Sequence, residues 1–214
     1  MRFKNREHAA QLLVERLSEY ANTNPLVLGV PRGAVPMAKT IADALKGEVD
    51  VVLVRKLSHP DQPEFAIGAI DESGNTFLMD WATEIASEYL ETEKRRQLQV
   101  LLQRRVRYTP NRAPIDPHDR IVVVVDDGIA TGSTMTAALR AVRAQGPKKL
   151  VGAVAIASPD AARTIVQECD ATVCLKVSAD FFAVGQFFED FTQVSDQDVI
   201  EVLRGSEAKI SAVG

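Results

Sequence analysis

Short apolar runs alternate along most of the chain with segments whose apolar residues recur every three or four positions. The runs have the length of strands, and they occupy residues 25–30, 49–54, 121–125, 150–157 and 172–177. Helical spacing marks the intervening segments at residues 5–21, from 33, at 82–106, from 131 and from 158. This alternation predicts an α/β fold, in which a doubly wound, mainly parallel sheet is flanked by helices.

The stretch between residues 55 and 79 interrupts this alternation. Residues 55–63, RKLSHPDQP, are polar and contain two prolines, so they predict a loop. The apolar segments AIGAI and TFLM flank DESGN, whose residues favour turns. We therefore expect a hairpin over residues 66–79.

Composition narrows the class of protein. A chain of 214 residues with 46% hydrophobic and 25% charged residues has the profile of a globular protein and not of a disordered one. The net charge of −4 argues against broad electrostatic binding to nucleic acid, and no apolar run approaches the roughly 18 residues of a membrane span. The charged start MRFKNREHAA lacks the apolar core of a signal peptide, so we expect a cytoplasmic protein in which Cys169 and Cys174 are reduced thiols.

The segment that carries chemistry is VVVVDDGIATGST, residues 122–134. Two acids, Asp126 and Asp127, stand where the apolar strand stops, and a short loop rich in glycine and hydroxyl groups then opens into a helix. Free backbone N–H groups and the positive end of the helix suit one phosphate group. The acids would repel that phosphate, so we expect them to face another part of the same ligand, such as sugar hydroxyls or a magnesium ion.

A strand end followed by an ordinary capped helix is the alternative interpretation of this segment. The ordered combination of an apolar strand, DD, a three-residue spacer and TGST is far more specific than a glycine-rich turn alone. The GK[ST] ending of a P-loop and the GxGxxG spacing of dinucleotide-binding folds are both absent from it.

Residues 122–134 resemble the phosphoribosyl-pyrophosphate signature of type I phosphoribosyltransferases. Nearly the whole chain is similar to a group of uncharacterised predicted phosphoribosyltransferases that share the landmarks PRGxVP, VRKL and FxAVGxFFxDF. The resemblance implies a single type I domain over residues 1–214, with a substrate-capping hood from about 1–24 and 178–214. It further implies that Asp126 and Asp127 contact the ribose 2′- and 3′-hydroxyls. The 5′-phosphate would be enclosed by Gly128, Ile129, Ala130, Thr131, Gly132, Ser133 and Thr134.

A second anion site is expected, because the activated sugar carries a pyrophosphate. Pro31, Arg32 and Gly33 also follow a strand and precede a helix, and they offer backbone N–H groups and one cation. In the family, the equivalent loop binds pyrophosphate, often through an unusual peptide conformation. A plain turn punctuated by proline and glycine is the alternative.

Arg55 and Lys56 end the next apolar run at the same expected sheet edge, where they would oppose the pyrophosphate and its magnesium. In related enzymes a basic residue at this point precedes a mobile catalytic lid, so Ser58–Phe65 is the lid candidate, with Glu64 as a lid contact. A closed lid would exclude water, which competes as a nucleophile. A role for His59 is left open.

The segment DFFAVGQFFEDF, residues 180–191, is aromatic enough to be plain core, yet it looks like the base-contacting hood of purine phosphoribosyltransferases. That resemblance implies base contacts from Phe182, Val184, Phe188 and Asp190. Asp190 stands one position further from Gly185 than in the 6-oxopurine enzymes.

At one position that bears on the acceptor, this sequence differs from the 6-oxopurine phosphoribosyltransferases. In 6-oxopurine enzymes, an acidic residue occupies the position of Ala130 and serves as the general base. Alanine cannot take a proton, so this loop is more similar to those of adenine, uracil and orotate enzymes. The motifs leave the acceptor itself open.

The tract from Lys94 to Arg112 contains seven cations and no acid. Aromatic residues are nearly absent from it, so a solvated helix face or a subunit contact is a better interpretation than RNA binding. In the superfamily, dimers often place one subunit's basic residues near the other's pyrophosphate, a role open to Arg104, Arg105 and Arg107.

The sequence thus predicts a magnesium-dependent phosphoribosyltransferase of nucleotide metabolism, acting on phosphoribosyl pyrophosphate and a small-molecule acceptor. We expect no metal ligated by protein side chains alone, since Mg²⁺ would be bound mainly through the activated sugar and water. A homodimer is expected. A non-catalytic sensor of the activated sugar, or a sugar-phosphate hydrolase on the same architecture, are the alternatives.

Overall fold

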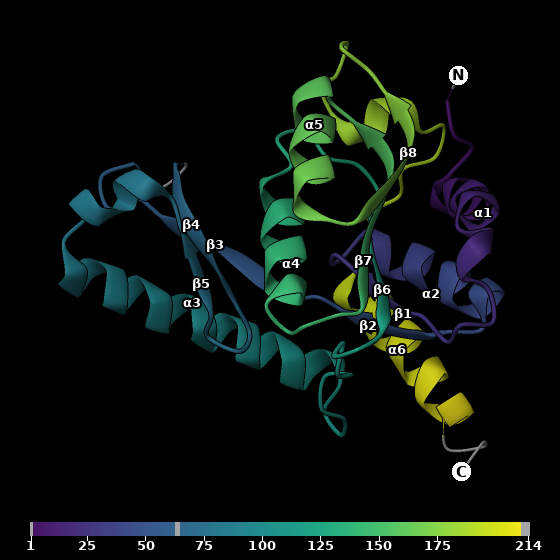
Figure 1. The fold of residues 1–214 in the computed structure, drawn as a ribbon, viewed down its shortest axis with the longest axis horizontal. Coiled ribbons are helices and arrows are strands. Elements are labelled where there is room, and N and C mark those ends of the chain that lie inside the picture. The colour runs from purple at the N-terminus through teal and green to yellow at the C-terminus, as the bar shows by residue number, and fades with distance from the viewer. Residues whose placement is uncertain (1, 63–64, 211–214) are drawn as a thin grey trace.

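The computed structural model describes residues 2–62 and 65–210, the side chains of residues 80, 83 and 206–210 excepted. Its centre is a five-stranded parallel sheet in the order β2-β1-β6-β7-β8 (Figure 1). The strands are β1 (Leu26–Gly29), β2 (Glu48–Val51), β6 (Ile121–Asp126), β7 (Lys149–Ala157) and β8 (Ala171–Val177).

Helices cover both faces of this sheet, and the alternation of side chains along each strand explains why. Val123 and Val125 of β6 belong to one core cluster together with residues of α1 (Arg6–Arg16) and α2 (Ala34–Leu45). Val122 and Val124 point the other way, into a cluster with α4 (Ser133–Arg143) and α5 (Pro159–Glu168). The predicted α/β fold with a mainly parallel sheet is therefore confirmed.

A separate arm extends from the main sheet beyond α4 (Figure 1). It consists of an antiparallel sheet of β3 (Val54–Ser58), β4 (Ala66–Asp71) and β5 (Thr76–Leu78), together with the 3-10 turn η2 (Asp80–Glu84) and the long helix α3 (Ser87–Tyr108). The predicted hairpin is present as β4–β5. In its turn, the Asp71 side chain accepts hydrogen bonds from the backbone N–H groups of Ser73 and Asn75.

The predicted loop at residues 55–63 is wrong over its first four residues, which form most of β3. Their polar side chains obscured a strand that is held by pairing: Arg55 lies opposite Ile70, and Leu57 lies opposite Gly68. Only Leu57 of this set is buried, so the apolar alternation that normally marks a strand is missing.

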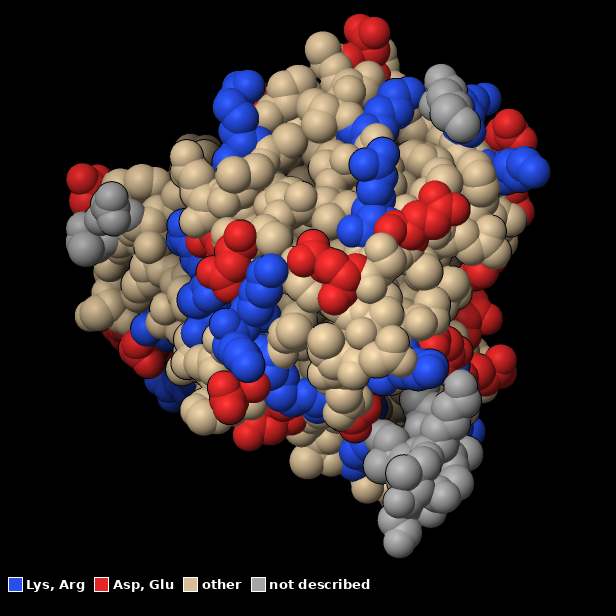
Figure 2. Space-filling model, turned by 45° about the vertical axis from the view of Figure 1, so that its right-hand side comes forward, with Lys and Arg blue, Asp and Glu red and all other residues tan. Residues whose placement is uncertain are grey.

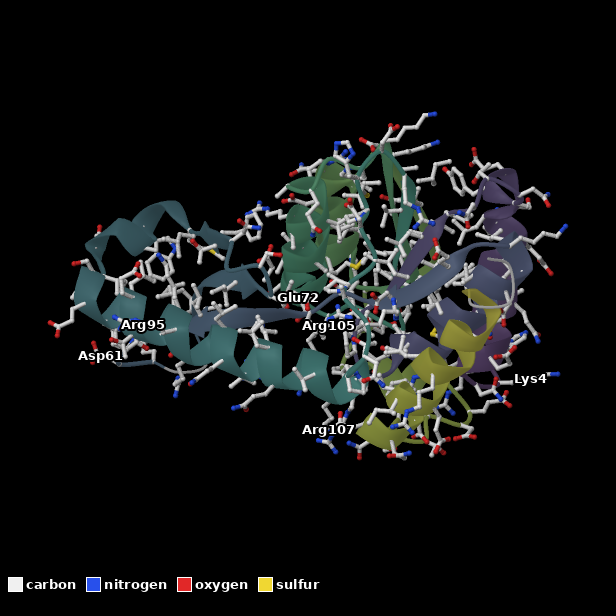
Figure 3. The ribbon with its side chains drawn as sticks, turned by 90° about the horizontal axis from the view of Figure 1, so that it is seen from below. Lys4, Asp61, Glu72, Arg95, Arg105 and Arg107 are labelled. Atoms are coloured by element: carbon white, nitrogen blue, oxygen red, sulfur yellow. The ribbon has the colours of Figure 1, made fainter. Side chains whose placement is uncertain are left out.

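Arg105 ties the arm to the main sheet. Its guanidinium donates from Nη1 to Asp50 Oδ1 of β2 at 2.9 Å and from Nη2 to the Val51 carbonyl at 3.0 Å. Its Nε and Nη2 also reach both carboxylate oxygens of Glu72, each at 2.6 Å. Figure 3 shows Glu72 and Arg105 side by side where the arm meets the main sheet.

The segment near the N-terminus pairs with the segment that precedes the last helix. Phe3 pairs with Phe188 as an isolated bridge, and Phe3 N donates to the Phe187 carbonyl at 2.8 Å. The last helix, α6 (Asp196–Ile210), was not predicted and packs against α2 and α3. Short 3-10 turns stand at η1 (Ser18–Tyr20) and η3 (Val184–Phe187). Cys169 and Cys174 are free and half-buried.

Candidate functional site

Two loops that were predicted separately are brought into contact at one edge of the sheet. β1 and β6 pair side by side up to Gly29 and Val125, so the loops that follow them leave the sheet together. A Cβ built on Gly33 would lie only 2.1 Å from Asp127 Oδ2. The carboxylate of Asp127 therefore lies directly against the backbone of the loop 31–33, with no room for a side chain between them.

The loop after β6 keeps the open first turn that an anion site requires. Helix α4 begins at Ser133, after the N-cap Gly132 in the left-handed conformation (φ 74°). Glycine has no side chain to cap the helix, and Thr131 Oγ1 accepts only a long bond from Ser133 N, at 3.4 Å. Thr131 Oγ1 and Ser133 Oγ are 2.9 Å apart, and Thr131 and Thr134 are exposed. Backbone N–H groups and hydroxyl groups therefore gather at a positive helix end.

The two acids have different surroundings. Exclusion of solvent raises the pKa of Asp126 well above its usual range, and the neighbouring Asp127 carboxylate adds to this effect. Hydrogen bonds from the backbone N–H groups of Asp127 and Gly128 oppose it. Asp127 instead accepts a hydrogen bond from Arg6 Nε at 2.7 Å. Burial thus raises the pKa of one acid, while the other acid faces a fixed positive charge.

Arg6 was missed in the sequence analysis. It is the first residue of α1, after the N-cap Asn5, whose side chain accepts from His8 N. A cation is electrostatically unfavourable in the first turn of a helix. That local mismatch is the signal that could have singled it out, because sequence rules are most often broken at functional sites.

The loop 31–33 has a cis peptide bond between Pro31 and Arg32, an unusual peptide conformation of the kind that the resemblance implies. Arg32 Nη1 lies 3.9 Å from Asp196 Oδ1 at the start of α6. Asp196 also accepts from the Tyr108 hydroxyl at 2.7 Å and pairs with Arg107 at 2.8 Å. Burial, with the bond to Asp196, raises the pKa of Tyr108 to about 12.

Arg55 and Lys56 do not point to one place, since adjacent residues of a strand face opposite sides of a sheet. Arg55 faces α3, where its Nε donates to Gln97. Burial lowers the pKa of Arg55, and the nearby cations Arg104 and Arg96 lower it further. Lys56 is exposed and lines a cavity on the other side, against α4.

That cavity has a volume of about 480 Å³ and lies between the arm and α4. Thr131 and Ser133 of the loop 128–134 form part of its wall, so the cavity borders the candidate anion site. The rest of the wall is mainly apolar and includes Phe77 and Trp81. Trp81 stacks on Phe65 of the predicted lid, with ring centroids 5.2 Å apart.

Pro63 and Glu64 lie outside the described residues. Within the described part of the lid, His59 lies against Trp81, with ring centroids 6.3 Å apart, and its Nδ1 accepts from Asp61 N.

The four predicted base-contacting residues separate into different environments. Val184 packs at the site, because a Cβ on Gly128 would lie 2.5 Å from Val184 Cγ1. Phe182 is 90% exposed, whereas Phe188 is 2% exposed and packs on Phe3 with ring centroids 5.3 Å apart. Asp190 is exposed, and hydrogen bonds from Thr192 lower its pKa.

The basic tract of α3 is largely neutralised within the chain. Arg105 is buried against Asp50 and Glu72, and Arg107 pairs with Asp196. The same mixing of charge recurs on the face drawn in Figure 2, where basic side chains lie among acidic ones. Arg104 is half-buried, and its positive charge helps to lower the pKa of both Arg55 and Asp196.

Magnesium, which the resemblance implies, prefers oxygen ligands, and the carboxylates of Asp126 and Asp127 are suitable donors. Among the described residues, no group of three or more His, Cys, Asp or Glu side chains could hold a metal ion. These two acids would therefore supply only part of a coordination sphere, and a bound ligand and water would supply the remainder. No helix in the part of the chain that the structure describes combines the length and the apolar composition needed to cross a membrane.

Comparison with known proteins was made against families, curated sequences and solved structures. The family model described as a phosphoribosyl transferase domain matches residues 3–191. Two curated proteins, from Mycobacterium tuberculosis strains CDC 1551 and H37Rv, are each 40% identical over 99% of this chain, and their names assign them provisionally to the phosphoribosyl transferases. The chain spans about half the length of these relatives, 48% of each.

Solved structures show that other proteins share this fold. The crystal structure of TT1426 from Thermus thermophilus is 45% identical and has a TM-score of 0.87, with coverage of 96% of this chain and 99% of that one. A purine phosphoribosyltransferase from Pyrococcus horikoshii, 19% identical, has a TM-score of 0.50 with coverage of 89% and 93%, and it shows the shared fold. Since the family model covers residues 3–191 and the signature loops meet at one sheet edge, the chain belongs to the phosphoribosyl transferase domain family.

Proposed function

We propose that this protein transfers the 5-phosphoribosyl group of phosphoribosyl pyrophosphate to a nitrogen nucleophile and releases pyrophosphate, with Mg²⁺ bound through the activated sugar. The observation that carries the proposal is the contact between Gly33 and Asp127. It places a candidate pyrophosphate loop against a candidate ribose acid, one short loop away from the uncapped start of α4.

Each part of the ligand has a matching part of the site. The loop 128–134 would hold the 5′-phosphate with backbone N–H groups, and Asp126 and Asp127 would bind the ribose hydroxyls. Loop 31–33 would hold the pyrophosphate, with Arg32 as its cation. Bound Mg²⁺ would neutralise charge on the leaving pyrophosphate.

The chemistry follows from this placement. As the bond from C1 of the sugar to pyrophosphate breaks, positive charge develops on the sugar and negative charge on the leaving group. We expect the Asp127 carboxylate, with Asp126 where it is ionised, to stabilise the first charge, and Arg32 to stabilise the second. Arg55 would act from the α3 side, whereas Lys56, on the opposite face of β3, would act near the 5′-phosphate through the cavity wall.

The acceptor is proposed to be a nucleobase or related heterocycle bound beside Val184, with Phe182 closing over it. Val184 supports this placement by its contact with Gly128, and Phe182 supports it by its exposure. Phe188 is left out because its ring is buried. A cytoplasmic homodimer is proposed as well, and light scattering of the purified protein would test the dimer.

Pyrophosphate release tests the proposal. The protein is incubated with phosphoribosyl pyrophosphate, Mg²⁺ and a panel of nitrogen heterocycles, one at a time. Release that depends on one heterocycle supports the transferase. Binding of the sugar without turnover would favour the sensor, and release without any acceptor would favour a hydrolase.

The residue assignment has its own test in Asp127→Asn. Loss of one electrostatic contact of this kind lowers turnover by about 10²–10³. Asp119→Asn, a change of the same type at an exposed residue, is the control. Turnover by Asp127→Asn that equals that of the unaltered protein would refute the role of Asp127.

A further inference from the structure

Arg6 joins three parts of the molecule through one side chain. Its Nε donates to Asp127 Oδ2 at 2.7 Å, and its Nη1 donates to the Thr192 carbonyl at 2.7 Å. Its Cζ lies 3.8 Å from the centre of the Phe191 ring. Arg6 therefore links the first helix to the segment near residue 192 and to Asp127, which stands 121 positions later in the chain.

Asp127 is confined from two sides. Arg6 holds Oδ2, and the same oxygen lies where a Cβ of residue 33 would stand. The ion pair is largely withdrawn from solvent, with side-chain exposures of 14% for Arg6 and 13% for Asp127. A guanidinium in this setting fixes the direction of a carboxylate as well as its charge, because its donors form a rigid planar fork.

We propose that Arg6 is a positioning residue: it holds the Asp127 carboxylate in the orientation that binds the ribose and couples that orientation to the segment around Phe191 and Thr192. The inference rests on the proposed function, since it assumes that Asp127 binds the sugar. Arg6 acts through Asp127, so its effect depends on the carboxylate being present.

Lysine is the informative substitution. Arg6→Lys keeps one positive charge and a long aliphatic stem, but a single ammonium lacks the fork that reaches Asp127 and Thr192 together. Arg6→Met removes the charge and keeps much of the volume. If orientation matters, lysine restores part of the sugar affinity that methionine loses.

Calorimetric titration with phosphoribosyl pyrophosphate and Mg²⁺ tests this without an acceptor. We expect Arg6→Met to bind about tenfold more weakly or worse and Arg6→Lys to be intermediate. In an Asp127→Asn background, Arg6→Met should cause less than about a threefold further loss, because residues that act through one contact are not additive. Arg16→Met, at an exposed arginine on the same helix, is the matched control and should bind as the unaltered protein does.

The outcomes separate the two proposals. If the unaltered protein does not bind the sugar, the proposed function fails and this inference fails with it. If the unaltered protein binds and Arg6→Met binds equally well, or if its loss is undiminished in the Asp127→Asn background, only the role of Arg6 is overturned. Circular dichroism checks folding. Should Arg6→Met not fold, Arg6→Lys decides alone, and affinity equal to that of the unaltered protein would contradict the proposal.

Discussion

Gly33 and Asp127 are in such close contact that a single methyl group on residue 33 would overlap a carboxylate oxygen, 2.1 Å from Oδ2. The same Cβ would lie 3.1 Å from Arg6 Nε, so the methyl group would crowd both partners of the Arg6–Asp127 ion pair. The separation between the two loops therefore depends on glycine at this position.

Gly33→Ala is expected to lower affinity for phosphoribosyl pyrophosphate by at least tenfold, because the methyl group must displace the Asp127 carboxylate or the loop itself. Calorimetric titration measures the affinity. Gly205→Ala is the control, since a Cβ there meets nothing within 4 Å. Equal affinity for Gly33→Ala and the unaltered protein would show that the two loops can separate without cost to binding.

The raised pKa of Asp126 predicts how stability depends on pH. Between the ordinary carboxyl pKa and the raised pKa, the folded protein binds more protons than the unfolded chain, so stability falls as pH rises. Asp126→Asn removes this loss, so its melting temperature should exceed that of the unaltered protein at pH 8. The difference should shrink as the pH falls toward about 4, the ordinary carboxyl pKa. Melting curves across this range check the prediction, with Asp119→Asn as control; a constant difference would contradict it.

Arg105→Met is expected to destabilise the protein by about 3 kcal/mol, because Glu72 loses its cation and the buried Asp50 keeps only Arg112 as a cationic partner. Urea unfolding measures the change. Arg95→Met on the same helix should change stability by less than about 0.5 kcal/mol, since Arg95 is exposed. Similar losses of stability in the two variants would mean that the ion pairs of Arg105 contribute no more to the free energy of unfolding than an exposed arginine does.

Phe182 and Phe188 should respond in opposite ways to truncation. Phe188→Ala removes a buried ring and is expected to cost about 3–5 kcal/mol of stability. Phe182→Ala should leave stability within about 0.5 kcal/mol, because its ring is 90% exposed, but weaken binding of an acceptor if Phe182 covers it as proposed. Thermal melting and acceptor KM, once a heterocycle is identified, distinguish the two. If Phe182→Ala lost stability and Phe188→Ala did not, Phe182 would be the core residue and the roles given to the two rings would be wrong.

The parallel sheet could be predicted because strands that are buried on both faces consist of continuous runs of apolar residues. The run 121–125 is almost entirely valine, and it became the central strand β6. β3 left no such trace, because Arg55, Lys56 and Ser58 are polar and their strand is held by backbone pairing with β4. The helix α6 lies within the predicted hood segment 178–214, where the motif at residues 180–191 drew attention to aromatic residues and away from helical spacing.

The site was predictable where its residues adjoin one another in the sequence. Asp126, Asp127 and the loop that follows form one continuous motif, and the motif at residues 31–33 is equally local. Arg6 could not be found in this way, because its partner is 121 residues away and its role depends on how α1 packs. Arg55 and Lys56 show the converse problem, since neighbours in sequence came to lie on opposite faces of β3.

The anchoring of Arg105 limits what movement the arm can make. Its guanidinium binds Asp50 and Val51 on the main sheet and Glu72 on the hairpin at once. Arg105 and Glu72 both belong to the arm, so swinging the whole arm about residues 52–53 would leave their bond intact but would break the bonds from Arg105 to Asp50 and Val51. Any shielding of a bound sugar by the arm must therefore come from rearrangement within the arm, while its base keeps a constant angle to the main sheet.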